Sequence, residues 1–367
     1  MYKKYFKTTF GLVIFLILLI MIINIFVDIG NIYLRKIVTE PKVDEYIKTL
    51  LTSKNGLLRE GWNERLIKTN LAKEAGHMEC VILGSSHIMQ ISNIRNIGNI
   101  QKQCKSLLNL GVSGGSLEDI FVFSYFIFTN SKLPKKIFID IDPWTLKFNM
   151  GSRYGAYSME YMKMNKLLEI ENNTKIISYQ EEILKNLINW EYLFYNIKML
   201  KDKKFKAFDY FNNKILIPTK PYIYSQGYEK SIILADGGHI YSSDYLTKQK
   251  MSNPNIPMGG GDYKISGDAY NTVAITNLKK LLNFYQKNNI EVNFILTPYH
   301  PNVFKNGKTK PVKHMQEVQR IIFDIVKQYD LKIYGSFFPE EINCKENEFL
   351  DFMHPTTECL NKIDFSH

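Results

Sequence analysis

A serine, a histidine and a carboxylate in this chain are of the types that nucleophilic catalysis needs. Ser86 follows a short apolar run and a glycine, and Asp351 stands three positions before His354 near the end of the chain. A serine hydroxyl attacks an ester only when an imidazole accepts its proton and a carboxylate orients that imidazole. We therefore expect Ser86 to be the nucleophile, His354 the general base and Asp351 the residue that orients His354.

Acyl transfer also needs hydrogen-bond donors for the oxyanion that forms at the carbonyl. We expect the backbone N–H of Ser86, at the start of a helix, to be one donor. The N–H of Gly114 would be the second, because no side chain blocks its approach. Gly114 lies in a glycine-rich turn, and such turns also occur without any function.

Four further residues are expected at the same edge of the fold and are candidates for substrate contact. They are His87, Trp144, Tyr299 and His300. Aromatic rings can stack on sugars, but core and surface aromatics are common without a ligand. For the two histidines the alternative is an ordinary exposed loop residue.

The chain holds a second Asp-x-x-His sequence, Asp236 to His239, which competes with Asp351 to His354 for the catalytic role. It lies in a glycine-rich segment with no core strand before it. The later pair comes last in the chain and has a helix start behind it. We therefore favour Asp351 and His354.

The elements that would position these residues follow from the hydrophobic pattern. Five short apolar runs are typical of strands buried on both faces, and apolar helical stretches lie between several of them. This alternation predicts an α/β fold with a doubly wound, flavodoxin-like parallel sheet of about five strands and flanking helices. The candidate residues follow the carboxyl ends of the strands, where ligands bind in such sheets. The runs are 80–83, 107–112, 137–141, 292–296 and 331–334, with helices expected at 117–129, at 268–288 and from 311.

Three segments are expected around this core. Residues 1–30 would be a cytoplasmic stub and a transmembrane anchor, and residues 31–76 a juxtamembrane stalk with a first helix. Residues 77–367 would form the α/β domain, interrupted by a large insertion at about 150–265 that is rich in Tyr, Asn, Lys and Gly. The role of the insertion is left open.

The anchor prediction rests on the apolar run from Phe10 to Val27, close to the roughly 20 residues that cross a bilayer as a helix. Lys3, Lys4 and Lys7 precede the run, so the positive-inside rule puts the N-terminus in the cytoplasm and the domain outside. A cleaved signal peptide and a buried N-terminal helix are the alternatives. The residues after Val27 suit signal peptidase poorly, and the run has no polar face.

Composition and motifs exclude several other classes of protein. The chain has 367 residues, 45% hydrophobic, so it is neither disordered nor collagen-like. The net charge of +11 permits an anionic partner but selects none, and scattered lysines do not favour nucleic acid. Phosphate-loop, dinucleotide-binding and His-Glu-x-x-His motifs do not occur, so we expect no cofactor and no metal.

The four cysteines are Cys80, Cys104, Cys344 and Cys359, and none of their spacings suits a zinc site. Cys344 and Cys359 flank the segment around His354 and could approach one another. Connectivity does not follow from sequence, and we favour four buried thiols that act as small hydrophobic residues.

Taken together, three blocks resemble the SGNH/GDSL superfamily of hydrolases and transferases. Gly84-Ser85-Ser86 stands where the family has Gly-Asp-Ser, residues 109–114 match its Asn-x-Gly-x-Ser-Gly block, and Asp351 with His354 matches its late Asp-x-x-His. The resemblance covers about residues 78–145 and 268–363. It implies the nucleophile, base and oxyanion roles already assigned.

Two departures narrow the resemblance. Ser85 replaces the Asp of the first block, and Asp142-Pro143-Trp144 stands where the family has Gly-x-Asn, so one usual oxyanion donor is missing. Both changes are similar to the membrane-anchored branch that serves cell-envelope polymers, such as D-alanyl-lipoteichoic acid and alginate acetylation proteins. That branch works beside a multipass membrane-bound O-acyltransferase, and the resemblance implies such a partner here.

These observations predict an extracytoplasmic serine esterase or O-acyltransferase that acts on an envelope polysaccharide or a teichoic-acid-like polymer. The alternative is a non-catalytic relative that only scaffolds glycan assembly at the membrane. The missing Asn favours the scaffold, whereas the intact Ser86, Asp351 and His354 favour the enzyme. The acyl group, the acceptor, and hydrolysis versus transfer do not follow from the sequence.

Overall fold

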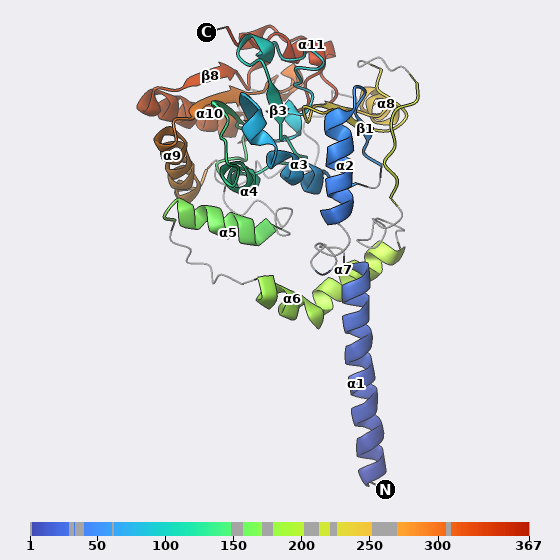
Figure 1. The fold of residues 1–367 in the computed structure, drawn as a ribbon. Helices are drawn as coiled ribbons and strands as arrows, with labels where there is room; N and C mark the ends of the chain where they lie inside the picture. Colours follow the sequence, from blue (N-terminus) through green and yellow to red (C-terminus); the bar gives the residue numbers. More distant parts are fainter. Residues whose placement is uncertain are drawn as a thin grey trace.

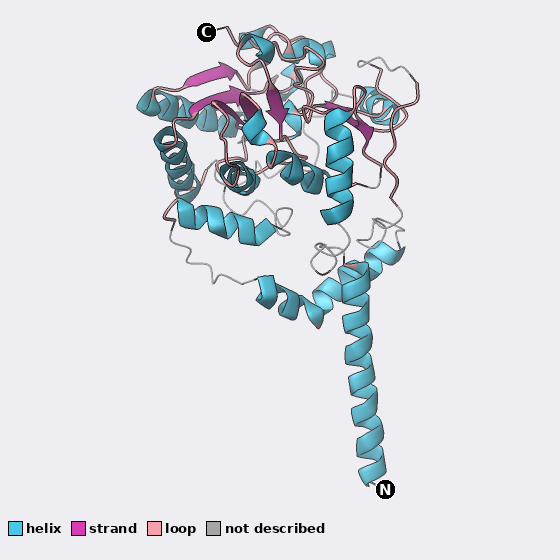
Figure 2. Ribbon diagram, viewed as in Figure 1, coloured by secondary structure: helices cyan, strands magenta, loops and turns pink. Residues whose placement is uncertain are grey.

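The protein is built around a five-stranded parallel sheet, seen here in a computed structural model (Figures 1 and 2). The structure describes residues 2–28, 33, 40–60, 62–147, 157–170, 179–201, 213–220, 226–251, 270–305 and 310–366. The strand order is β3-β2-β4-β7-β8, which is the flavodoxin-like order and confirms the predicted fold class. The strands are β2 (Cys80–Leu83), β3 (Leu107–Asn109), β4 (Lys136–Asp140), β7 (Glu291–Leu296) and β8 (Lys332–Gly335).

The two faces of the sheet are covered differently. Side chains alternate between faces along each strand, so Val81 and Leu83 join the large core beneath the crossover helices, whereas Ile82 joins a smaller core. The crossover helices are α4 (Leu117–Phe128), α9 (Thr272–Lys287) and α10 (Lys310–Tyr329). The smaller core is closed by 3-10 turns and the C-terminal segment around Phe365. The turns are η3 (Ser86–Ile88), η4 (Ile100–Lys102) and η8 (Pro339–Ile342), and the C-terminal segment begins with helix α11 (Thr357–Leu360). Two further turns are η7 (Pro301–Val303), whose Val303 belongs to the large core, and η9 (Glu346–Glu348).

Helix α4 begins where the sequence predicts it. Ser116 accepts a hydrogen bond from the Asp119 N–H, and the Asp119 carboxylate accepts one from the Ser116 N–H. This capping box satisfies N–H groups that have no partner within the helix.

The prediction of a stalk at 31–76 is wrong for residues 40–60 and 62–76, where one helix was expected and two helices pack into the domain. Helices α2 (Glu40–Thr52) and α3 (Glu64–Ala72), with the turn η2 (Ala75–His77), belong to the α/β domain. Tyr46, Ile67 and Leu71 are fully buried in the large core. Seven consecutive residues of α3 are buried, among them Lys68, Thr69 and Asn70. These polar residues make the sequence look like a surface helix, but each is hydrogen-bonded inside the domain.

Part of the predicted insertion forms a second sheet with a strand from the N-terminal region. Strands β1 (Leu57–Leu58), β5 (Ile232–Ile233) and β6 (His239–Ile240) pair antiparallel in the order β1-β5-β6. The other described helices of this segment are α5 (Ser158–Leu167), α6 (Tyr179–Leu187), α7 (Trp190–Lys201) and α8 (Ser243–Met251). Residues 150–156, 171–178, 202–212, 221–225 and 252–265 of the predicted insertion lie outside the described residues.

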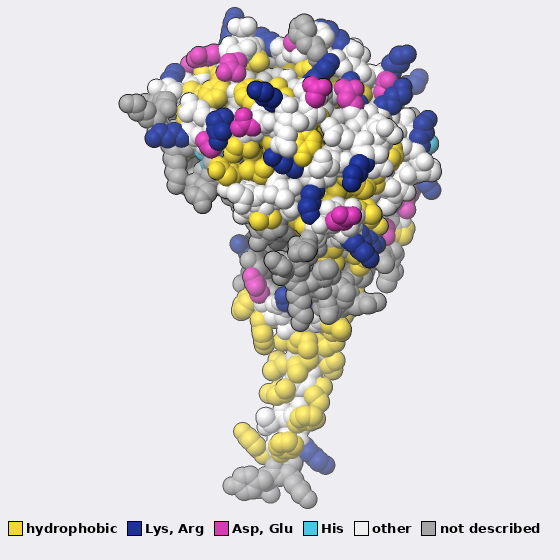
Figure 3. All heavy atoms as spheres, turned by 90° about the vertical axis from the view of Figure 1, so that its left-hand side faces the viewer, with side chains coloured by type: hydrophobic (Ala, Val, Ile, Leu, Met, Phe, Trp, Pro, Cys, Tyr) yellow, Lys and Arg dark blue, Asp and Glu magenta, His cyan; other side chains and the backbone are white. Residues whose placement is uncertain are grey.

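Helix α1 (Tyr2–Val27) projects from the domain as a separate shaft (Figure 1). Its segment Tyr5–Val27 is long and apolar enough to cross a membrane. Hydrophobic side chains surround this shaft in the space-filling view (Figure 3). The helices α6 and α7 lie across its C-terminal end, between α1 and the domain (Figure 1).

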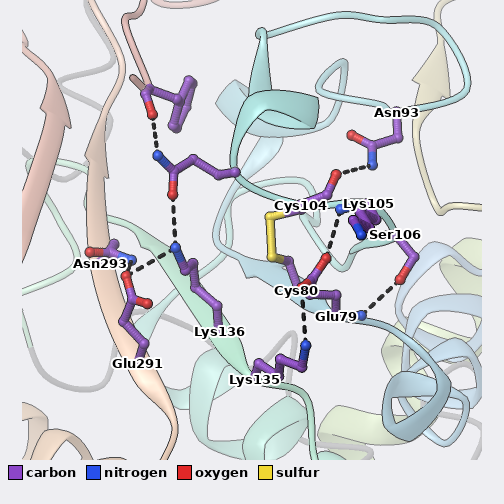
Figure 4. The surroundings of a disulfide bond; sticks show 12 residues. Glu79, Cys80, Asn93, Cys104, Lys105, Ser106, Lys135, Lys136, Glu291 and Asn293 are labelled. Atoms are coloured by element: carbon purple, nitrogen blue, oxygen red, sulfur yellow. Dashed lines mark hydrogen bonds and ion pairs between the residues drawn. A yellow bond between two sulfur atoms is a disulfide. The ribbon is translucent and has the colours of Figure 1, made fainter. Parts of the chain in front are cut away.

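The expectation of four free thiols is wrong, because all four cysteines form disulfides. Cys80 pairs with Cys104, and Cys344 pairs with Cys359. The first bond ties the start of β2 to the segment before β3, beside Glu79 (Figure 4). Pairing depends on distances between segments 24 and 15 residues apart in the sequence, which only the fold brings together.

Candidate active site

Ser86, His354 and Asp351 form a continuous hydrogen-bonded chain at the carboxyl edge of the sheet. Ser86 Oγ lies 2.9 Å from His354 Nε2. On the other side of the ring, Nδ1 lies 2.8 Å from Asp351 Oδ2 and 3.0 Å from Oδ1. The three residues therefore have the relative positions that the sequence predicts for nucleophile, base and orienting carboxylate.

The carboxylate of Asp351 is held in its ionised form. Burial alone would raise its pKa, but the charge of His354, the hydrogen bond to its ring and the N–H groups of Met353 and His354 outweigh burial and lower the pKa to about 2. Both N–H groups donate to Oδ1 at 2.9 Å. An ionised carboxylate at Nδ1 selects the tautomer in which Nε2 accepts the serine proton.

Ser86 lies at the start of the single 3-10 turn η3, directly after β2. Gly84 allows the close approach of Asp140, since a Cβ on Gly84 would come within 2.3 Å of the Asp140 Cβ. Ser85 then caps the turn: its hydroxyl accepts from the His87 N–H at 3.1 Å. The sequence predicts that a helix starts at Ser86, with a positive dipole end that would favour an oxyanion. A three-residue turn has no such dipole and provides only individual N–H donors, so this prediction is wrong.

The two expected oxyanion donors have open N–H groups. Within the described part of the chain, neither the Ser86 N–H nor the Gly114 N–H has a protein acceptor. Gly114 is exposed and has a φ of 55°, in the left-handed region that favours glycine. Trp144 supports the turn, because its Nε1–H donates to the Gly115 carbonyl at 2.8 Å.

Helix α3 holds the Gly114 turn, a role that the sequence did not suggest. Arg65 donates to both carboxylate oxygens of Asp119, at 2.7 and 2.9 Å, and to the Ser113 carbonyl at 3.1 Å. The Glu64 carboxylate accepts from the N–H and the hydroxyl of Ser113. In the sequence, only the adjacent opposite charges of Glu64 and Arg65 could have pointed to this contact.

Lys68, one turn further along α3, joins three segments beneath the site. Its ammonium group donates to the carbonyls of Asn109 and Gly237 at 2.8 and 2.5 Å. Burial lowers the pKa of Lys68 to about 8. The Asn109 amide in turn donates to the carbonyls of Ile88 and Ile91, so the segment after the nucleophile is fixed to β3.

His87 forms a buried layer behind His354. Its ring packs edge-on against His354, with centroids 5.1 Å apart. His87 Nδ1 has hydrogen-bond geometry with the Thr297 hydroxyl at 3.0 Å and lies 2.9 Å from Asp142 Oδ1. Burial and the charge of Asp142 raise the pKa of neighbouring Asp140 well above its ordinary value.

The four residues expected to contact substrate are all buried. His87, Trp144, Tyr299 and His300 are between 0 and 5% exposed. The interpretation of the two histidines as exposed loop residues is therefore wrong as well. Trp144 and Tyr299 pack edge-on against the His87 ring, so these rings support the site from within. Substrate contact by any of the four stays a prediction.

The competing pair from the insertion lies elsewhere. Asp236 accepts from the Ser92 hydroxyl at 2.6 Å and from the Ile94 N–H at 3.1 Å. Burial lowers the pKa of His239 well below its ordinary value. The pair that lies beside Ser86 is Asp351 and His354, and its catalytic role stays a prediction.

The insertion nevertheless reaches Ser86 through an aromatic pair. The Tyr241 hydroxyl donates to the Ser86 carbonyl at 3.5 Å, and the Tyr245 ring stacks on Tyr241 with centroids 4.7 Å apart. Tyr245 also lines a surface pocket of about 400 Å³. Its other lining residues are charged or hydroxylic: Arg59, Glu60, Glu229, Lys230, Ser231, Ser242, Asp244 and Lys248.

Among the residues that the structure describes, no group of three or more His, Cys, Asp or Glu side chains is placed to hold a metal ion. Comparison of the chain with protein-family models and with curated proteins finds no match.

Proposed function

We propose that this chain is a membrane-anchored serine esterase or O-acyltransferase of the SGNH/GDSL type that acts on a cell-envelope polysaccharide or a teichoic-acid-like polymer. The observation that carries the proposal is the 2.9 Å contact between Ser86 Oγ and His354 Nε2, with Asp351 on the opposite ring nitrogen. The three sequence blocks and the flavodoxin-like strand order support the superfamily assignment.

In the proposed mechanism, Ser86 Oγ attacks the carbonyl carbon of an ester while His354 Nε2 takes the hydroxyl proton. The N–H groups of Ser86 and Gly114 bind the resulting oxyanion. Collapse of this intermediate breaks the ester C–O bond, and His354 returns the proton to the departing alcohol. Water or a glycan hydroxyl then attacks the acyl-serine, again with His354 as base, and frees Ser86.

An extracytoplasmic location is part of the proposal. The two disulfides support it, because such bonds persist mainly in oxidising compartments. The apolar helix α1, preceded by Lys3, Lys4 and Lys7, supports anchoring with the domain outside. A multipass O-acyltransferase partner is proposed from the family resemblance alone.

The glycan substrate is supported by the surroundings of Ser86. The Tyr241 and Tyr245 pair connects the nucleophile to a pocket whose carboxylates, cations and hydroxyls could all hydrogen-bond a polyhydroxylated ligand. Aromatic faces beside such groups suit a sugar ring.

Scaffolding without catalysis is the second candidate, and one observation favours it. Where the family has a third oxyanion donor, this chain has Trp144, whose Nε1–H is already bonded to the Gly115 carbonyl. Only the Ser86 and Gly114 N–H groups are then expected to serve the oxyanion.

Turnover of an activated acetyl ester by the full-length protein in detergent separates the two functions. We expect Ser86→Ala and His354→Ala to reduce the rate to that of buffer, while Ser366→Ala, at an exposed serine, should match the wild type. A wild type without turnover, together with normal glycan modification in cells that carry only Ser86→Ala, would establish the scaffold instead.

A further inference from the structure

The insertion contains two helices to which the proposed catalysis assigns no role. Residues 179–201, here called the α6–α7 elbow, run from Tyr179–Leu187 to Trp190–Lys201 with a short joint between them. The elbow lies across the C-terminal end of α1 and separates α1 from the α/β domain (Figure 1).

Asn24 of α1 joins the elbow at its joint. Its side chain is fully buried. Nδ2 donates to the carbonyls of Asn186, Leu187 and Asn189 at 3.0 to 3.3 Å, and Oδ1 accepts from Asn196 at 3.0 Å. The last carbonyls of a helix have no partners within it, and in lipid no water is present to replace them. Asn24 satisfies the carbonyl of Leu187, the last residue of α6, without water. The carbonyls of Asn186 and Asn189 also accept from the N–H groups of Asn189 and Leu193.

A second set of contacts holds the elbow at the end of α1. Asp28 accepts from the Tyr192 hydroxyl at 2.8 Å and from the Tyr33 N–H at 2.9 Å. The Tyr33 hydroxyl donates to the Ile183 carbonyl at 2.9 Å. Both helices of the elbow are therefore attached to α1.

The part of α1 that contacts the elbow is the C-terminal end of its candidate membrane span. Lys7 is the last charged residue before the apolar stretch, and the roughly 20 residues that span a bilayer then reach from there to Val27. Side chains 5–19 are all exposed, whereas Ile20, Asn24 and Val27 are buried. With a rise of about 1.5 Å per residue, the elbow overlaps roughly the last 10 Å of the span.

The elbow also exposes large apolar side chains. Leu184, Trp190 and Phe194 are 65, 62 and 68% exposed, and Ile188 is 49% exposed. Elsewhere outside α1, no large hydrophobic residue in the described part of the chain exceeds the 53% of Ile217. Trp190 and Phe194 are four residues apart on α7, a spacing that puts helical side chains on one face. Leu184 lies on α6, and Ile188 directly follows the end of that helix.

We propose that the α6–α7 elbow lies in the headgroup region of the leaflet in which α1 ends, with Leu184, Ile188, Trp190 and Phe194 in contact with lipid. Interfacial helices present apolar residues to lipid in this way, and Trp is enriched at that depth. The α/β domain is then held against the membrane surface and does not swing on a free tether. This inference rests on α1 spanning a membrane and is independent of catalysis by Ser86.

Tryptophan fluorescence tests the contact directly, because the chain has three tryptophans and only Trp190 is exposed. Trp62 and Trp144 are 6 and 5% exposed. The full-length protein is reconstituted into vesicles of phosphatidylcholine and phosphatidylglycerol, with plain or brominated acyl chains. We expect brominated lipid to quench about a third of the emission of the wild type, as one of three tryptophans would give, and none of the emission of Trp190→Phe.

A relocated tryptophan is the matched control. Phe323 is 44% exposed and belongs to α10. Figure 1 shows α10 well apart from α1, so Trp190→Phe/Phe323→Trp should show no quenching. Equal wild-type emission in plain and brominated vesicles would overturn the proposal and assign the apolar elbow to a protein partner. Quenching that persists in Trp190→Phe would also overturn the proposal. So would a mature protein that begins after Val27 and does not enter the vesicles. Loss of ester turnover in Ser86→Ala leaves the quenching unchanged, so the two proposals fail separately.

Discussion

Arg65 on α3 binds Asp119 at the start of α4 through two charge-assisted hydrogen bonds, and the same guanidinium group donates to the carbonyl of Ser113. The Arg65 and Asp119 side chains are 11 and 5% exposed. One arginine thereby fixes both ends of the turn that carries Gly114. The position of the Gly114 N–H, the proposed second oxyanion donor, therefore depends on a helix that precedes the sheet in the sequence.

Arg65→Ala should therefore impair catalysis without removing a reacting group. Breaking a buried ion pair by removing one partner costs about 3 kcal/mol or more of folding free energy, and a displaced Gly114 N–H should slow ester turnover by about tenfold or more. Thermal unfolding and turnover of the purified variant measure both effects. Arg320→Ala is the control, because the Arg320 side chain is 60% exposed in its ion pairs and exposed pairs contribute little. Equal turnover by the two variants would contradict the role given to Arg65.

Asp351→Asn should have a pH-dependent effect on stability. The pKa of Asp351 is lowered from 3.8 to about 2 on folding, so the carboxylate stabilises the fold above pH 3.8 and loses this contribution as pH falls towards 2. The shift corresponds to about 2 kcal/mol at neutral pH. Urea unfolding of wild type and variant at pH 7 and pH 3 should show a difference in unfolding free energy that narrows in acid. A difference that is the same at both pH values would show that the charge of Asp351 is not what stabilises it.

The Cys344–Cys359 bond should matter for the catalytic loop as well as for stability. It closes the segment that carries Asp351 and His354, with a sequence separation of 15, for which loop-closure entropy predicts about 3 kcal/mol. The double variant Cys344→Ala/Cys359→Ala should unfold at lower temperature and react more slowly with ester per folded molecule.

The other disulfide is the comparison for this experiment. Cys80→Ala/Cys104→Ala removes a bond in the smaller core, away from the catalytic loop, so it should lose stability but keep the ester rate of its folded fraction. If both double variants keep that rate, the Cys344–Cys359 bond does not position the triad.

The sequence was sufficient for the main sheet and the triad for a physical reason. Buried parallel strands such as β2 and β4 are continuous apolar runs, and side chains after their carboxyl ends must meet at one edge. Ser86 could be placed at that edge on this basis, whereas Asp351 and His354 were chosen by their late position in the chain and the helix start that follows them.

The wrong predictions concern features that the local pattern of polar and apolar residues does not record. Strands of two residues, such as β5 and β6, are too short to show the alternation of polar and apolar residues that marks a strand. The burial of Trp144 depends on the Gly115 carbonyl that its ring nitrogen binds. The function of Arg65 and Lys68 depends on backbone atoms at Ser113, Asn109 and Gly237, which no side-chain motif records.

The central claim is that Ser86 is an activated nucleophile, and a fluorophosphonate probe tests it most directly. The probe phosphonylates a serine whose proton is taken by an adjacent imidazole, whatever the natural acyl group. We expect peptide mass spectrometry of the labelled full-length protein to locate the adduct on Ser86. Labelling should be absent in Ser86→Ala, almost absent in His354→Ala and weak in Asp351→Asn, with all three variants folded. An adduct on another serine, or equal labelling of wild type and Ser86→Ala, would contradict the account.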